Sequence, residues 1–257
     1  MQFTQRSPWR HFPAVFRVLL VAGPALALLG AYALYLVHLD GYLWATGEDR
    51  AVEWATVVTY LVALAVAAAL VPRWWTSGLR LNAVAYVLLC GAFFFIAGEE
   101  ISWGQRILGF EGPPALVAAN QQDEANLHNL LGRYALHGLY IVIGVWGIGV
   151  GRWVARRVAW LRPWYAFAPS KELFWWFLPA LAYYAYVDYV APAGRALGVA
   201  LGEGPPRFQE PVELLLGLGF LLFVVEAWMR LNDHAAAAMN AGAPPDLQRL
   251  GAADHRE

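Results

Sequence analysis

Apolar stretches that end in polar residues decide the fold, and the clearest covers residues 81–106, LNAVAYVLLCGAFFFIAGEEISWGQR. Residues 81–98 carry no charge, and an apolar run of about 20 residues is long enough for a helix to cross a bilayer. Glu99 and Glu100 follow directly, at the C-terminal end of this expected helix. Unpaired carbonyl groups and a partial negative charge gather at such an end, so two carboxylates there need a compensating partner. The stretch therefore predicts both a membrane span and a polar site.

The composition of the whole chain agrees with a membrane protein. Of its 257 residues, 60% are hydrophobic and 14% are charged, whereas soluble domains carry about 25% charged residues. A net charge of −1 gives no argument for nucleic acid as a partner. The single cysteine, Cys90, lies inside an apolar run, so a disulfide within the chain is excluded. We expect a multi-pass protein of the cell inner (cytoplasmic) membrane, with the lipid bilayer as its surroundings.

Further apolar runs predict an all-α, polytopic membrane helix bundle of about six transmembrane helices. Each span has to be helical, because a lone strand in lipid would leave its backbone polar groups unpaired. The predicted spans are residues 15–37, 51–71, 81–98, 134–151, 172–190 and 212–231. They form one transmembrane domain over residues 1–231, with an outer loop at 99–133 and a flexible cytoplasmic tail at 232–257.

The basic residues predict the orientation of the bundle. Thirteen of the 18 lie in the N-terminal tail, the second and fourth loops and the C-terminal tail, and five lie on the other side. Loops rich in Lys and Arg stay in the cytoplasm. We therefore expect both termini to be cytoplasmic and the loop at residues 99–133 to be extracytoplasmic.

In this orientation, most ionisable side chains close to the membrane fall at the outer ends of the spans. They are His38, Asp40, Glu53, Glu99, Glu100, His137, Asp188 and Glu213, and the outer loop adds Arg106, Glu124, His128 and Arg133. At the cytoplasmic ends, Glu226 is the only acid expected inside the membrane. Charges at such depths are costly and often mark a site or a pathway. For Glu53 and Glu213 an ordinary role in a first helical turn is favoured, since negative charge offsets the helix dipole there.

This cluster predicts a candidate site with three kinds of residue. The catalytic candidates are Glu99, Glu100, His137 and Arg106; the substrate-binding candidates are Trp103 and Arg133; the metal candidates are His128, His137 and Asp188. One of the two glutamates would be the general base, and Arg106 would hold an anionic group. If the helix continues past Glu100, Glu99 shares a face with Trp103 and Arg106.

The metal candidates predict a divalent metal such as zinc as the cofactor. His137 opens its span, where the dipole favours the neutral imidazole that a ligand or a base needs. Asp188 lies at the end of the fifth predicted span and would orient one of the histidines. The sequence contains no His-Glu-x-x-His motif, so the prediction depends on residues that are distant in the chain.

The block Gly98-Glu-Glu-Ile-Ser-Trp-Gly-Gln-Arg-Ile-Leu-Gly-Phe110, with Asn126-Leu-His-Asn-Leu130, resembles a signature of uncharacterised multi-pass bacterial membrane proteins. It is also similar to the first motif of the CAAX-type (CPBP) intramembrane proteases, a Glu-Glu pair followed by Arg after three residues. That similarity implies that Glu99 and Glu100 act in hydrolysis. Here Arg106 follows Glu100 after five residues, and the later Phe-x-x-x-His and His-x-x-x-Asn patterns of the family are not matched.

The favoured interpretation is a membrane protein with an extracytoplasmic Glu/His/Asp site. It would be a hydrolase or transferase that acts on a lipid-linked or membrane-embedded substrate. The alternative is a structural or partner-binding protein whose outer charges form an ion-pair network. A transporter agrees less well with the sequence, because the middles of the spans are almost wholly apolar.

Overall fold

A computed structural model of the chain describes residues 7–109, 133–158, 167–202 and 204–240. Every regular element in these ranges is helical, which confirms the all-α prediction. Most of the predicted outer loop lies outside the described residues, and Glu124 and His128 lie there with it. The end of the predicted tail, residues 241–257, also lies outside them.

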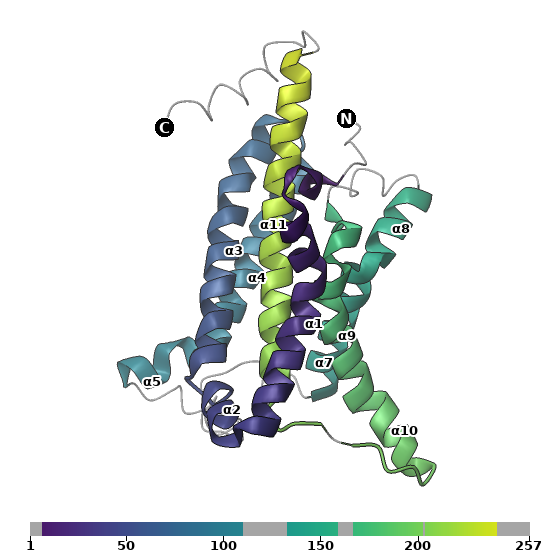
Figure 1. Cartoon of the computed structure of the whole chain (residues 1–257). Coiled ribbons are helices and arrows are strands. Elements are labelled where there is room, and N and C mark those ends of the chain that lie inside the picture. The colour runs from purple at the N-terminus through teal and green to yellow at the C-terminus, as the bar shows by residue number, and fades with distance from the viewer. Residues whose placement is uncertain (1–6, 110–132, 159–166, 203, 241–257) are drawn as a thin grey trace.

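Long helices run alternately in opposite directions along the bundle (Figure 1). They are α1 (Ala14–Val37), α3 (Ala51–Thr76), α4 (Arg80–Glu100), α7 (Arg133–Val145), α9 (Phe174–Ala185) and α11 (Gln209–Asn240). The shorter elements are η1 (Pro8–His11), α2 (Leu39–Ala45), η2 (Ser102–Gly104), α5 (Gln105–Leu108), η4 (Trp146–Val150), α8 (Gly151–Arg157), η6 (Lys171–Leu173), η7 (Tyr186–Val190) and α10 (Ala191–Ala196). We call the end of the bundle that carries α2, α5 and α10 the α2 end, and the opposite end the η1 end.

Among the described residues, five helical segments are long and apolar enough to cross a membrane, so the chain is a multi-pass membrane protein. They are Ala14–Val37, Ala51–Thr76, Arg80–Glu100, Tyr134–Val154 and Gln209–Asp233. The remaining predicted span, residues 172–190, is helical but is divided among η6, α9 and the π-helical turn η7. It therefore does not form one uniform helix of spanning length.

The last helix is longer than its apolar run predicts. α11 continues to Asn240, so residues 232–240 of the predicted flexible tail are helical. Ala235–Ala238 lie in this extension, and alanine has the highest intrinsic helix propensity. Local propensity thus lengthens the helix beyond the membrane-spanning part.

Two helix pairs build the bundle, and α11 joins them. α3 packs along α4, α7 packs along α9, and α11 contacts both α3 and α9 (Figure 1). Glycines of α7 and of the following turn η4 lie close to α9: a Cβ at Gly144 would lie 2.6 Å from Leu181 Cβ, and one at Gly147 would lie 2.1 Å from Phe177 Cγ. Because α7 is held against α9, it does not close on α4 across the bundle.

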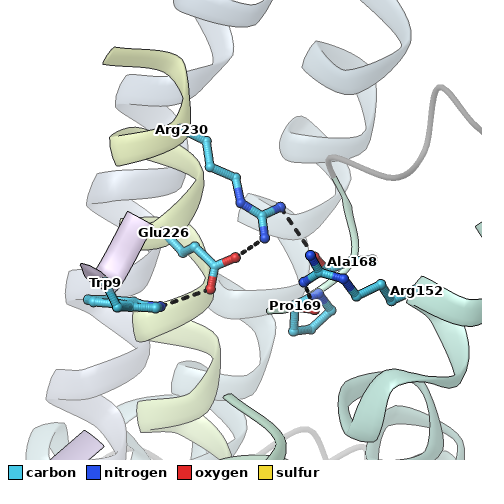
Figure 2. A network of polar contacts seen from close by, with 6 residues as sticks. All are labelled: Trp9, Arg152, Ala168, Pro169, Glu226 and Arg230. Atoms are coloured by element: carbon cyan, nitrogen blue, oxygen red, sulfur yellow. Dashed lines mark hydrogen bonds and ion pairs between the residues drawn. The ribbon is translucent and has the colours of Figure 1, made fainter. Parts of the chain in front are cut away.

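A buried polar network ties several segments to α11 near the η1 end (Figure 2). Glu226 is buried, forms an ion pair with Arg230 and accepts a hydrogen bond of 3.1 Å from Trp9 Nε1. Arg230 also donates to the carbonyl oxygen of Ala168 at 3.4 Å, and Arg152 donates to that of Pro169 at 3.4 Å. A buried carboxylate is tolerated when it is paired and hydrogen-bonded in this way. The network therefore anchors η1 and the segment before η6 to the last helix.

We predict that Glu226→Gln destabilises the protein by about 3–5 kcal/mol, because it leaves Arg230 buried without its counter-charge. Unfolding of the purified protein in detergent, followed by circular dichroism, measures this change. Asp40→Asn is the control, since Asp40 is exposed and its neutralisation should change stability by less than about 0.5 kcal/mol. Equal stability of the two variants would contradict the structural role of the network.

Candidate functional site

A cavity of about 1070 Å³ lies inside the bundle, and its walls come from α3, α4, α7, α9 and α11. Six glutamates line it: Glu48, Glu53, Glu99, Glu100, Glu210 and Glu213. All six lie near helix ends at the α2 end of the bundle, so we call this part the carboxylate end. Deeper in the bundle the lining is aromatic and includes Phe93, Trp146, Phe167, Phe220 and Phe223, which we call the aromatic end.

The spacing of residues on α11 produces this change from polar to apolar. The residues of α11 that line the cavity in successive turns are Gln209, Glu213, Leu216, Phe220 and Phe223. They are spaced three or four apart, so they share one face of the helix. With a rise of 1.5 Å per residue, this face runs for about 21 Å along the bundle. One helix face therefore carries both the carboxylate end and the aromatic end.

Glu213 lies at the centre of a hydrogen-bonded group from three helices. The hydroxyl of Tyr184, on α9, donates to Glu213 Oε1, and the hydroxyl of Tyr140, on α7, faces the same carboxylate as a second donor. The two tyrosine rings are stacked, with centroids 4.5 Å apart and planes 5° from parallel. Two hydroxyl donors hold this carboxylate at a fixed position in the cavity.

A histidine and an aspartate extend this group. The ring of His137 lies 4.6 Å from that of Tyr184, and His137 Nδ1 is 2.8 Å from Asp188 Oδ2. Asp188 is buried within the π-helical turn η7, and helix α10 follows it. The expectation that Asp188 ends a helix was therefore wrong, because the chain stays helical as far as Ala196. The structure does bring His137 and Asp188 together, as their predicted roles require.

The Glu-Glu pair divides between two surroundings. Glu99 is buried and accepts a hydrogen bond of 2.5 Å from Trp103 Nε1. Glu100 lines the cavity close enough to Glu53, Glu210 and Glu213 for their charges to repel one another. Proton sharing or a bound cation offsets repulsion between such carboxylates. The two glutamates therefore have different chemical environments.

The helix does not continue past Glu100, so Glu99, Trp103 and Arg106 do not share the face that a continued helix would have given them. α4 ends at Glu100, and Ser102 and Trp103 take positive φ angles of 48° and 55°. This turn folds the Trp103 ring back over Gly98, where a Cβ would lie 2.8 Å from the ring. Trp103 also contacts Phe94 and Phe95, so it supports Glu99 from the surface of α4 and is not part of the described cavity lining.

The structure leaves three of the predicted site residues without a described side chain. Arg106 belongs to α5 and Arg133 begins α7, but their side chains, like the whole of His128, lie outside the described part of the chain. Within the described residues, no three His, Cys, Asp or Glu side chains are grouped so that they could hold a metal ion. The zinc site stays a prediction, because one of its three candidate ligands is His128.

The sequence did not predict several of the cavity residues, or predicted a different role for them. Glu53 does accept a hydrogen bond from the backbone N–H of Asp49, as its predicted first-turn role requires, but it also lines the cavity. The first-turn role of Glu213 was wrong: α11 begins at Gln209, and tyrosines hold the carboxylate instead. The spacing of Glu210 and Glu213, which are three residues apart and precede an apolar face, was a signal that could have identified them.

We predict that Tyr184 and Glu213 are energetically coupled. A double-mutant cycle with Tyr184→Phe and Glu213→Gln should give a coupling free energy of about 1–3 kcal/mol, the range for a buried hydrogen bond to a charged group. Thermal unfolding in detergent measures it. The matched control cycle uses Tyr189→Phe, because Tyr189 is exposed on the same segment, and its coupling should stay within about 0.5 kcal/mol. Equal coupling in both cycles would argue against the hydrogen-bonded group.

Comparison with known proteins does not add a functional assignment. The chain matches no protein-family model, no curated protein and no solved structure. Its function therefore has to be argued from the cavity and from the side chains that line it.

Proposed function

We propose that this protein is a membrane-embedded enzyme, a hydrolase or transferase, that acts on a lipid-linked or lipid-like substrate. The observation that carries the proposal is the single cavity that joins a carboxylate end to an aromatic end. Its volume of about 1070 Å³ is at the upper end of small-molecule sites. An amphiphile would place its polar group among the glutamates and tyrosines and its hydrocarbon among the aromatic rings.

In this proposal, Glu100 and Glu213 form the acid–base pair. One carboxyl group takes the proton from water or from an acceptor hydroxyl as its oxygen attacks, and the other gives a proton to the leaving oxygen or nitrogen. The tyrosine hydroxyls on Glu213 support it as a positioned group. Glu100 is favoured over Glu99 as the acid or base, because Glu99 Oε1 already accepts a hydrogen bond from Trp103. The similarity to the first motif of the CPBP proteases stays a prediction that agrees with hydrolysis.

His137 would carry protons to and from this pair. Asp188 at 2.8 Å accepts the Nδ1 proton and so directs Nε2 as the atom that gains and loses a proton. The ring of Tyr184 at 4.6 Å links His137 to the Glu213 group. No step of the proposal depends on a metal ion.

The proposed topology has six crossings, with η6, α9, η7 and α10 together as the fifth. Two features support it: α1 begins and α11 ends at the η1 end (Figure 1), and the basic residues of the sequence favour the cytoplasm for that end. The α2 end, and with it the carboxylate end of the cavity, would then face the extracytoplasmic side of the inner membrane.

A structural role is the second candidate, and one observation favours it. Glu99 and Asp188, two of the predicted site residues, are each hydrogen-bonded to a neighbouring side chain, as in a network that holds helix ends together. A structural role does not explain a cavity lined by six glutamates, so the cavity supports the enzyme instead. The two candidates predict different effects of changing Glu100 and Glu213. The enzyme predicts lost turnover with unchanged stability, and the structural role predicts loss of folding.

To test the proposal, the protein is reconstituted in a bacterial membrane lipid extract, and lipid products are followed by mass spectrometry. Glu100→Gln and Glu213→Gln keep the side-chain shape but cannot transfer a proton. Each should lower product formation by about 10²–10⁴-fold, the usual contribution of a general acid or base. Asp40→Asn is the control, because Asp40 is exposed and does not line the cavity, so this variant should keep its rate.

Unfolding in detergent is measured on the same variants. Stability near that of the parent, together with lost turnover, is the expected result. No product from the parent protein, or equal rates in all variants, would overturn the enzyme. Loss of folding in both Glu100→Gln and Glu213→Gln would support the structural role.

A further inference from the structure

We infer that the cavity opens sideways into the bilayer between α4 and α7, and that the acyl chain of the substrate enters through this opening. The inference rests on the proposed function, because it identifies the guest as that enzyme's substrate. It restricts the substrate class to molecules that carry a hydrocarbon chain and that enter the cavity from the membrane and not from water.

Three residues define the opening: Phe95 on α4, and Leu139 and Val142 on α7. Each of them lines the cavity and is exposed, with 37%, 53% and 65% of its area accessible. In the described part of the chain, α4 packs on α3 and α7 packs on α9, but α4 and α7 do not form a packed pair. The cavity is therefore continuous with the lipid-facing surface at this position.

The depth of the opening in the membrane determines whether lipid hydrocarbon or water surrounds it. Phe95 is five residues before the end of α4, about 8 Å along the helix, and Val142 is nine residues into α7, about 14 Å along it. Both residues lie inside segments that can cross a membrane, Arg80–Glu100 and Tyr134–Val154. At this depth the surroundings are hydrocarbon and not water. The apolar residues of the opening match an acyl chain.

In the described part of the chain, the wall at the aromatic end of the cavity is held in place by hydrogen bonds from two arginines. Phe167 lines the aromatic end, and the next two residues are held in place through their carbonyl oxygens by Arg230 and Arg152 (Figure 2). Arg230 is in turn paired with Glu226, which accepts a hydrogen bond from Trp9. A chain that enters between α4 and α7 would end against Phe167, Phe220 and Phe223.

The direction of the cavity matches that of a membrane lipid. The glutamates lie near the helix ends, at the height of lipid head groups, and the aromatic end lies toward the bilayer centre. A lipid of the adjacent leaflet has the same order of polar and apolar parts. It could move into the cavity sideways without turning over.

Photo-crosslinking of the reconstituted protein tests this inference. The probe is a phosphatidylcholine whose acyl chain carries a diazirine, and mass spectrometry maps the crosslinked residues. Phe220 and Phe223 are the diagnostic positions, because only 7% and 1% of their area is exposed and bulk lipid reaches them only through the cavity. We expect crosslinks at these positions in the parent protein.

Val142→Trp should fill the opening and lower crosslinking at Phe220 and Phe223 by about tenfold, which corresponds to about 1.4 kcal/mol. Leu88→Trp is the matched control: Leu88 is 70% exposed on α4 but does not line the cavity, so this variant should crosslink like the parent. Crosslinks on the exposed face of α1 should be equal in all three proteins. A parent without crosslinks at Phe220 and Phe223, or crosslinks that Val142→Trp leaves unchanged, would overturn the inference.

Product formation in the same proteoliposomes separates this inference from the proposed function. Glu100→Gln should keep the crosslinks and lose turnover. If the parent protein crosslinks at Phe220 and Phe223 but forms no product, the entry of an acyl chain is supported and the proposed enzyme activity is overturned. If the parent protein forms product but shows no crosslinks on α11, the proposed enzyme activity is supported and entry from the bilayer is overturned.

Discussion

Acidic side chains inside a membrane-spanning bundle need hydrogen-bond donors, and the rest of this structure depends on that constraint. Glu226 receives a donor from Trp9 and a counter-charge from Arg230, while Glu99 receives a donor from Trp103. Glu213 is held by tyrosine hydroxyls, and Asp188 by His137. Most of these donors sit on aromatic rings. A chain rich in Trp and Tyr can thus bury carboxylates without many lysines or arginines nearby.

The same donors join segments that are far apart in the chain. Trp9 and Glu226 are 217 residues apart, and their contact brings the first described element onto the last helix. Tyr184 ties α9 to α11, and His137 ties α7 to the π-helical turn η7. These contacts place the two helix pairs around α11. The space between the pairs becomes the cavity, because α7 is drawn to α9 by its glycines and not to α4.

Much of the fold could be predicted, because a bilayer imposes length and hydropathy on each helix. The five membrane-crossing helices agree with the apolar runs, and Glu99 and Glu100 do end α4 as expected. Less of the site could be predicted. The turn after Glu100 requires positive φ angles at Ser102 and Trp103, which come from the contact of Trp103 with Glu99 and Gly98. Contacts of this kind leave no periodic signal in the sequence.

The sequence by itself determined that the protein is a helical membrane protein and that acids gather at one end of its helices. Both follow from the local cost of placing charge and backbone polar groups in lipid. Only the tertiary structure decided which acids share a cavity. Glu53 and Glu213 line it together with Glu99 and Glu100, and Glu99 also accepts a hydrogen bond from Trp103. The physical reason is that a cavity depends on how neighbouring helices rotate and separate, and packing between distant segments decides both.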